Sequence, residues 1–153
     1  MYVAIRTAEG LVQDGKTLIG LGRWSRAAAL GVLALEETGK IWLLVSIAEA
    51  GNDSAALKKT WREYRSHPAK SGQTLTPGPL PESEVRSQIQ HGYGMDFDRL
   101  KQLALYSNLL TDDRWVVPEL VVTRRHAEFV LALAGAMVGQ ALELYKKDQA
   151  GKS

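Results

Sequence analysis

The feature that most constrains the fold is a long apolar stretch, residues 25–50, which is interrupted by one polar block. At 100° per residue, its apolar side chains cover most of a helical surface instead of a single stripe. They are Leu30, Val32, Leu33, Ala34, Leu35, Ile41, Trp42, Leu43, Leu44, Val45 and Ala48. A helix that is apolar nearly all round is typical of the centre of a domain, where neighbours pack on several sides. The stretch therefore predicts a central helix, with Ser25 as its N-cap.

The polar block is EETGK, residues 36–40. By helical spacing Glu37 falls inside the main apolar stripe, where an unpaired carboxylate is costly to desolvate. We therefore expect Glu37 to pair with an Arg or Lys from elsewhere in the fold. Glu36 and Lys40 are four residues apart and are expected to pair along the helix. The alternative is a direct role for the block at a functional site.

Composition places the chain among ordinary globular proteins. Its 153 residues predict a single domain, residues 1–153, that is large enough for a substantial core. Hydrophobic residues make up 45% and charged residues 24%, and the net charge of +2 argues neither for nor against a polyanionic partner. The sequence contains no cysteine, which excludes disulfides and thiolate metal sites.

Neither a targeting segment nor a membrane span is predicted. The first residues, MYVAIRTAEG, lack the basic-then-apolar order of a signal peptide. The longest uncharged run, residues 129–142, has 14 residues and includes Gln140, so it is short and polar for a membrane span. We therefore expect a cytoplasmic protein that does not contact a membrane.

Apolar spacing and capping residues predict further helices around the central one. Gly51 is expected to end the central helix, and Asp53 or Ser54 to cap the next. A loop at about residues 69–81, a short helix at 82–90 and an extended piece before Pro118 are also expected. The main helices cover about residues 3–21, 55–66, 96–106 and 118–148. Pro118 is expected in the first turn of the last of these helices. Gly135 and Gly139 in the same helix are expected to allow close approach of another helix. The pattern predicts an all-α fold, an up-and-down bundle of four to five helices.

Cations concentrate on the helix expected at residues 55–66 and just after it. They are Lys58, Lys59, Arg62, Arg65 and Lys70, together with His67. Leu57, Trp61 and Tyr64 share one side of this helix by spacing. Cations beside aromatic rings suit a phosphodiester with splayed bases, so these residues form a candidate RNA-binding surface. The alternative is a solvated amphipathic helix with solubilising charges.

Arg62 and His67, with four residues between them, have the chemistry for RNA cleavage without a metal. An imidazole can move a proton on a 2′-hydroxyl or a leaving 5′-oxygen, and a guanidinium can hold the phosphate. The spacing alone is not specific, because Arg86 and His91 repeat it. The alternative for His67 is a helix C-cap, favoured by the helix dipole by about 0.3–1 kcal/mol.

Three blocks resemble the AbiV-type abortive infection family. They are GRWSRAAALGVLALEETGK at 22–40, WREYRSHPAK at 61–70 and KQLALYSNLLTDDRWVVP at 101–118. That family is placed in the HEPN superfamily of helical bundles, many of which are ribonucleases that work as dimers. Their signature is an Arg, four to six residues and then a His at the end of a bundle helix. Arg62 and His67 match this signature, and Lys70 matches a further basic position.

The resemblance implies antiviral defence, in which a triggered protein stops host growth and so limits phage propagation. In one mechanism, a homodimer joins two Arg62/His67 pairs across a two-fold axis and cleaves RNA without a metal or other cofactor. In the other, a non-catalytic module uses the basic surface to bind RNA, the translation machinery or a phage protein. Glu63 counts against catalysis, because many HEPN nucleases have an uncharged polar residue there; an acid at this position either repels a substrate phosphate or, equally, orients Arg62. Glu37 and Lys40 match the polar block of the family's second helix, and Glu37 is expected to orient Arg62.

Overall fold

The computed structural model describes residues 1–65, 97–106, 108–109 and 115–151. Its helices are α1 (Tyr2–Gly20), α2 (Trp24–Ala50), α3 (Ser54–Tyr64), α6 (Phe97–Leu105), α7 (Pro118–Val121) and α8 (Arg124–Ala150). Between α6 and α7 the two-residue strands β1 (Asn108–Leu109) and β2 (Trp115–Val116) pair antiparallel, with Leu109 opposite Trp115. The predicted all-α bundle is confirmed. The loop expected at residues 69–81 and the short helix at 82–90 lie outside the described residues.

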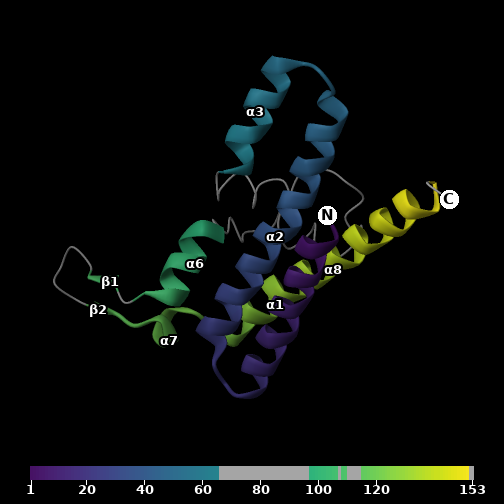
Figure 1. Cartoon of the computed structure of the whole chain (residues 1–153). Coiled ribbons are helices and arrows are strands. Elements are labelled where there is room, and N and C mark those ends of the chain that lie inside the picture. Colours follow the sequence, from purple (N-terminus) through teal and green to yellow (C-terminus); the bar gives the residue numbers. More distant parts are fainter. Residues whose placement is uncertain (66–96, 107, 110–114, 152–153) are drawn as a thin grey trace.

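Helix α2 is the centre of the bundle, as its all-round apolar character predicts. α1 runs antiparallel to it, α8 crosses behind, α6 packs against its middle and α3 folds back along its far end (Figure 1). Each large aliphatic side chain buried in this way contributes roughly 1.5–3 kcal/mol. The core includes Ile5 and Val12 from α1, Val32, Leu35 and Ile41 from α2, Leu100 from α6, and Val130, Leu133 and Met137 from α8.

The closest approaches of other helices to α8 are made at Gly15 of α1, where an added Cβ would lie 2.5 Å from Leu131 Cδ2, and at Gly31 of α2, not at the glycines of α8. A Cβ added at Gly31 would lie 2.7 Å from Val130 Cγ1 and 3.3 Å from the backbone N of Leu131. At Gly139 no atom lies within 4 Å, and at Gly135 the nearest is 3.9 Å away. The prediction that Gly135 and Gly139 admit a close neighbour was wrong within the described chain, because α2 meets α8 on its Val130–Leu131 face.

The start of α2 also differs from the prediction. The helix begins at Trp24, preceded by Arg23, and no side chain caps it. Ser25 is buried, and its Oγ donates a hydrogen bond to Oε1 of Glu119 on α7 at 3.3 Å. Ser25 is therefore a tertiary contact between α2 and α7 instead of an N-cap.

The single helix predicted from Pro118 to the C-terminus is divided in two. Pro118 begins α7 as expected, but Val122 is extended, with φ −94° and ψ 111°. Thr123 then caps α8 reciprocally: its Oγ1 accepts from the backbone N of His126 at 3.4 Å, and its own backbone N donates to Nδ1 of His126 at 3.1 Å. Such a capping box is a strong helix start, and it explains the new helix at this point.

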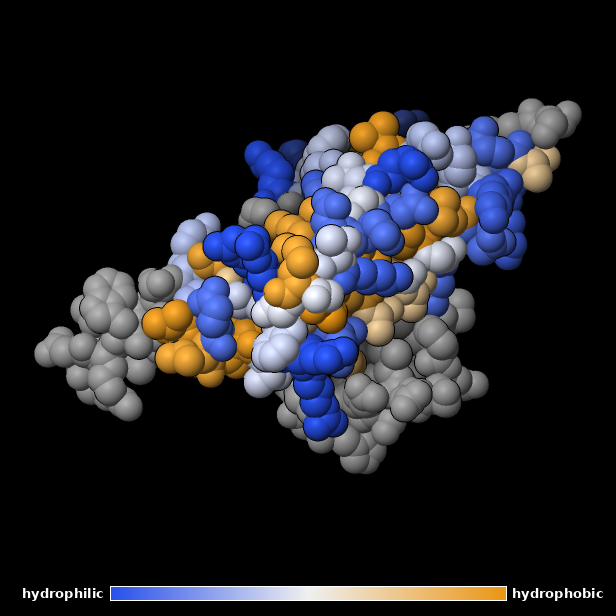
Figure 2. Space-filling view, turned by 90° about the horizontal axis from the view of Figure 1, so that it is seen from below, coloured by the Kyte–Doolittle hydropathy of each residue, from blue (hydrophilic) through white to orange (hydrophobic). Residues whose placement is uncertain are grey.

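Exposed apolar side chains gather on and beside α7. Val117 is 41% exposed, Leu120 81% and Val121 39%. Figure 2 shows an orange, hydrophobic patch at the left of the molecule, in the region of α7. A contiguous apolar patch of this kind on a small domain is typical of a protein interface.

Helix α8 is the one described helix whose length and composition would allow it to cross a membrane. In the bundle its apolar side chains have another use, because Val130, Leu133 and Met137 are buried against α1 and α2. Core packing therefore accounts for the apolar character of α8. That the protein does not contact a membrane stays a prediction.

Candidate nucleic-acid interface

Helix α3 carries the candidate interface away from the body of the bundle. It packs mainly against the last turns of α2 and stands clear of α1 and α8 (Figure 1). Lys58, Lys59 and Arg62 lie on α3 and Arg65 is its C-cap, and all four side chains are exposed. They point away from the face that meets α2, which is formed by residues with lower exposure: Ala56, Leu57, Thr60, Glu63 and Tyr64.

Local contacts define where α3 begins. Gly51 ends α2 with a positive φ of 53°, which suits a residue without a Cβ. Asp53 then accepts hydrogen bonds at Oδ1 from the backbone N of Ala55 at 2.9 Å and of Ala56 at 3.1 Å. The predictions for Gly51 and Asp53 are therefore confirmed. An N-cap of this kind is worth about 1 kcal/mol, so a short exposed helix depends on it strongly.

The cations of α3 have no acidic partner in the part of the chain that the structure describes. The ion pairs there involve Arg6, Lys40, Lys101, Arg124 and Lys146, none of which lies on α3. Glu63 is the only carboxylate of α3, and it lies toward the α2 side with lower exposure. Four positive charges that no described carboxylate neutralises form a surface that attracts polyanions.

The structure describes one half of the predicted Arg62/His67 pair. Arg62 lies in the last turn of α3 with its side chain in solvent. His67 and Lys70 lie outside the described residues, as do Arg86 and His91. The proximity of Arg62 and His67, and the C-cap alternative for His67, therefore stay predictions.

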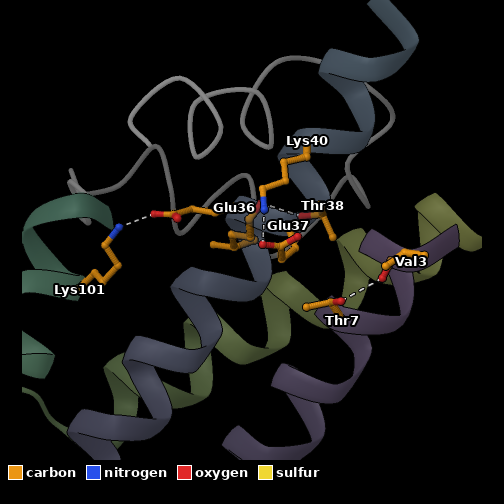
Figure 3. A network of polar contacts seen from close by, with 8 residues as sticks. Val3, Thr7, Glu36, Glu37, Thr38, Lys40 and Lys101 are labelled. Carbon is orange, nitrogen blue, oxygen red and sulfur yellow. Dashed lines mark hydrogen bonds and ion pairs between the residues drawn. The ribbon is translucent and has the colours of Figure 1, made fainter. Parts of the chain in front are cut away.

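Among the described residues, the polar block of α2 forms ion pairs with Lys101 and within the block, and these partners differ from those expected (Figure 3). Glu36, 3% exposed, accepts a hydrogen bond from Lys101 Nζ of α6 at 2.5 Å. Glu37 pairs with Lys40 within α2. The predicted Glu36–Lys40 pair was wrong, because the side chain of Glu36 points to α6 while that of Glu37 lies about 100° further round the helix.

Lys101 is buried, 7% exposed, between two carboxylates. Asp98 Oδ1, one turn earlier on α6, lies 3.3 Å from its Nζ. Burial by itself lowers the pKa of the Lys101 ammonium, but the hydrogen bonds and charges of Glu36 and Asp98 outweigh burial and raise that pKa above its ordinary value. Lys101 is therefore charged at neutral pH and joins α6 to α2.

Sequence reasoning did not single out Lys101. The available clue was its spacing: it follows Phe97 by four residues and precedes Ala104 by three, and both are buried. A lysine on the apolar face of a predicted helix requires a buried carboxylate as partner. Glu36 is that carboxylate.

Glu37 has a cationic partner, but in the described chain it is Lys40 and not Arg62. The α2–α3 hairpin turns near Asn52, so Arg62 lies level with about Trp42, roughly 7 Å along the axis from Glu37. The side chains of Glu37 and Lys40 are 22% and 26% exposed. A pair of this kind stabilises a helix by about 0.3–0.5 kcal/mol and does not orient Arg62.

His126, the histidine that lies within the described residues, has a structural role. His126 caps α8 through its Nδ1, so it is engaged at the start of that helix. Within the described ranges, no group of three or more His, Asp or Glu side chains is arranged to hold a metal ion.

The chain matches a known family model over most of its length. The family model HEPN_AbiV, described as AbiV, matches residues 1–139. The matched region contains α2 with its polar block, all of α3 and the first part of α8. No curated protein and no solved structure matches the chain.

Proposed function

The chain belongs to the AbiV family of HEPN proteins, and from this we propose that it is a phage-defence endoribonuclease that works without a metal. The observation that carries the proposal is Arg62, which is exposed in the last turn of α3 and, among the described residues, has no acidic partner. Lys58, Lys59 and Arg65 extend the same positive surface. His67 follows Arg62 in the sequence at the spacing of the HEPN signature.

In the proposed reaction, a His67 imidazole removes the proton of an RNA 2′-hydroxyl. The 2′-oxygen attacks the adjacent phosphorus, and the bond to the 5′-oxygen breaks. The leaving 5′-oxygen takes up a proton, so the products are a 2′,3′-cyclic phosphate and a 5′-hydroxyl. Arg62 donates hydrogen bonds to the phosphate oxygens, on which negative charge increases in the transition state.

We propose further that two copies form a homodimer and combine their Arg62/His67 pairs. A second histidine can then protonate the leaving oxygen while the first acts as base. The shared site is inferred from membership of the AbiV family and not from the exposed apolar patch on α7, because α7 contacts Ser25 at the start of α2 whereas α3 packs against the other end of α2. Sedimentation at micromolar concentration tests this part, and a monomer under all conditions would contradict the shared site.

A second candidate function is RNA binding without cleavage, which blocks translation or senses a phage component such as a phage protein. It is favoured by Glu63, the carboxylate that follows Arg62 on α3. A negative charge there repels a substrate phosphate close to the reacting group, whereas the outer cations of α3 still attract a polyanion.

The experiment compares wild type, Arg62→Ala and His67→Ala for growth arrest in cells and for cleavage of end-labelled RNA with EDTA present. Arg26→Ala is the matched control, because Arg26 is an exposed arginine near the opposite end of α2. Loss of both readouts in both variants, with a cyclic phosphate on the wild-type product, is expected. Growth arrest that persists in His67→Ala would favour the binding module instead.

A further inference from the structure

Trp61 departs most clearly from what its helix position predicts. Its spacing from Leu57 and Tyr64 suggests one shared apolar side, yet Trp61 is 49% exposed while Leu57 and Tyr64 are partly covered. The described contacts of α3 with the bundle are made mainly to α2. A large indole left half in solvent gains little from the core of its own chain and remains accessible to an external ligand or partner.

The Trp61 ring has a defined orientation. Its centroid lies 5.6 Å from that of Tyr64, and the two planes are inclined by 76°, an edge-to-face arrangement. Such a contact is favourable by about 0.5–1.5 kcal/mol beyond burial, so it restricts the indole. An edge-to-face contact occupies at most one face of a ring, which leaves the other face of the indole uncovered by Tyr64.

The charges around Trp61 are those of a nucleic-acid site. Lys58 precedes it by three residues and Arg65 follows it by four, so both are its neighbours on the helix surface. Arg62 is adjacent in sequence. All three are exposed and, in the described part of the chain, lack an acidic partner. A flat apolar ring among exposed cations suits a ligand with a flat base and a negative backbone.

We propose that Trp61 is a stacking platform for one unpaired base, and that the ligand of α3 is therefore single-stranded RNA. This inference rests on the proposed function and narrows it. A base inside a duplex has both faces stacked on its neighbours, so duplex RNA can offer α3 only its phosphates. The cations then supply attraction that is independent of sequence, and Trp61 supplies the preference for an unstacked strand.

The test measures affinity for a short fluorescent 2′-O-methyl oligouridylate, which lacks the attacking hydroxyl and stays intact. Trp61→Ala is expected to weaken binding about 5- to 150-fold, the range for one stacked base. Trp61→Phe keeps a ring and is expected to retain most of the affinity. Trp24→Ala is the matched control, since Trp24 is 37% exposed but lies at the start of α2, roughly 28 Å along that axis from the level of Trp61.

Two further readouts separate stacking from charge. An abasic version of the same strand is expected to bind wild type and Trp61→Ala with equal affinity. Duplex RNA is also expected to bind the two proteins with equal affinity, and more weakly than the oligouridylate binds wild type. Lys58→Ala is expected to lower the slope of log affinity against log salt by about 0.7, whereas Trp61→Ala leaves the slope unchanged.

The inference is overturned if Trp61→Ala binds the oligouridylate within twofold of wild type, or if duplex RNA binds wild type as tightly as the single strand. If Lys58→Ala and Arg62→Ala still weaken binding in that case, RNA remains the ligand and only the stacking role is lost. If wild type binds none of the RNA probes, the proposed function fails together with the inference. Growth arrest that depends on Trp61 without any effect on RNA affinity would assign the indole to a protein partner and overturn its role in RNA binding.

Discussion

Lys101 on α6 and Lys58 on α3 are the same residue type in opposite surroundings. Lys101 is 7% exposed and lies between the carboxylates of Glu36 and Asp98. Lys58 is exposed and, among the described residues, has no carboxylate partner. The charge of the first is neutralised inside the fold, whereas the charge of the second is available to a ligand.

This difference shows why a count of cations says little about binding. Both lysines contribute equally to the net charge of +2. Burial decides their roles, because a buried ammonium requires a partner and an exposed one is already solvated by water. The same contrast holds for aromatic residues: the indole of Trp42 belongs to the packed part of α2, while that of Trp61 is half exposed.

The largest expected effect comes from breaking the buried pair. Lys101→Met leaves the Glu36 carboxylate buried without this cation and is expected to lower the free energy of unfolding by about 3–5 kcal/mol. The matched Lys58→Met change is expected to stay within about 0.5 kcal/mol. Urea unfolding followed by circular dichroism measures both.

A second change sharpens this result. Adding Glu36→Leu to Lys101→Met removes the buried carboxylate as well and is expected to restore much of the lost stability. Equal losses in Lys101→Met and Lys58→Met would show that the two lysines do not differ in the way the structure indicates.

The next effect is on function and leaves stability unchanged. Arg62→Ala is expected to lower the rate constant of RNA cleavage about 10²- to 10³-fold, the usual result of removing a donor that stabilises charge in a transition state. Its urea midpoint is expected to match wild type, because Arg62 is exposed. Single-turnover cleavage and unfolding are measured on the same preparation. If Arg62→Ala were less stable than wild type but cleaved RNA normally, Arg62 would have a structural role like that of Lys101 and not a role in cleavage.

The pH dependence of stability separates the two lysine environments again. The pKa of Lys101 is raised in the folded protein. The stability that its charge adds to the folded protein is therefore fully present below the ordinary lysine pKa of about 10.4, and it is lost as pH rises through the pKa of Lys101 in the folded protein. This loss is smaller than that in Lys101→Met, because the neutral amine stays within hydrogen-bonding reach of Glu36. Urea midpoints at pH values from about 9 to 12 are compared with those of Lys101→Met, in which this alkaline component is expected to be absent. An identical alkaline loss in the variant would contradict the prediction.

The smallest expected effect concerns the start of α3. Asp53→Ala removes the bonds to the backbone N–H groups of Ala55 and Ala56, at a cost of about 1 kcal/mol. Hydrogen exchange is expected to increase in α3 and to remain unchanged in α6. Asp53→Asn, which can still cap, is the control. Faster exchange throughout both helices would mean that α3 and α6 unfold together.

Much of the fold was predictable because it depends on local physics. Periodic apolar residues indicated α1, α2 and α3, and the predicted bounds differ from the observed ones by one or two residues wherever the structure describes them. Gly51 and Asp53 marked the α2–α3 turn through short-range backbone chemistry. The candidate site was predictable in its charge, since Lys58 and Arg62 are exposed as an amphipathic helix requires.

Errors arose where two segments had to meet. Val122 could not be recognised as a break, because Pro118 and the apolar residues after it fit one continuous helix. Gly135 and Gly139 have the small size that close packing needs, yet α8 packs closely against Gly15 of α1 and Gly31 of α2. Which small residue is covered depends on how each helix is rotated, and a single helix does not determine that rotation.

By itself, the sequence determined that this chain forms a helical bundle with a central apolar helix and a basic, aromatic-bearing helix after it. The tertiary structure alone decided that Glu36 is buried against Lys101, 65 residues away, and that Trp61 is half in solvent. The physical reason is that hydrogen bonding and periodicity act within a turn or two of helix. Burial of a side chain is decided by neighbours that are distant in the chain, and a rotation of about 100° per residue exchanges a buried position for an exposed one.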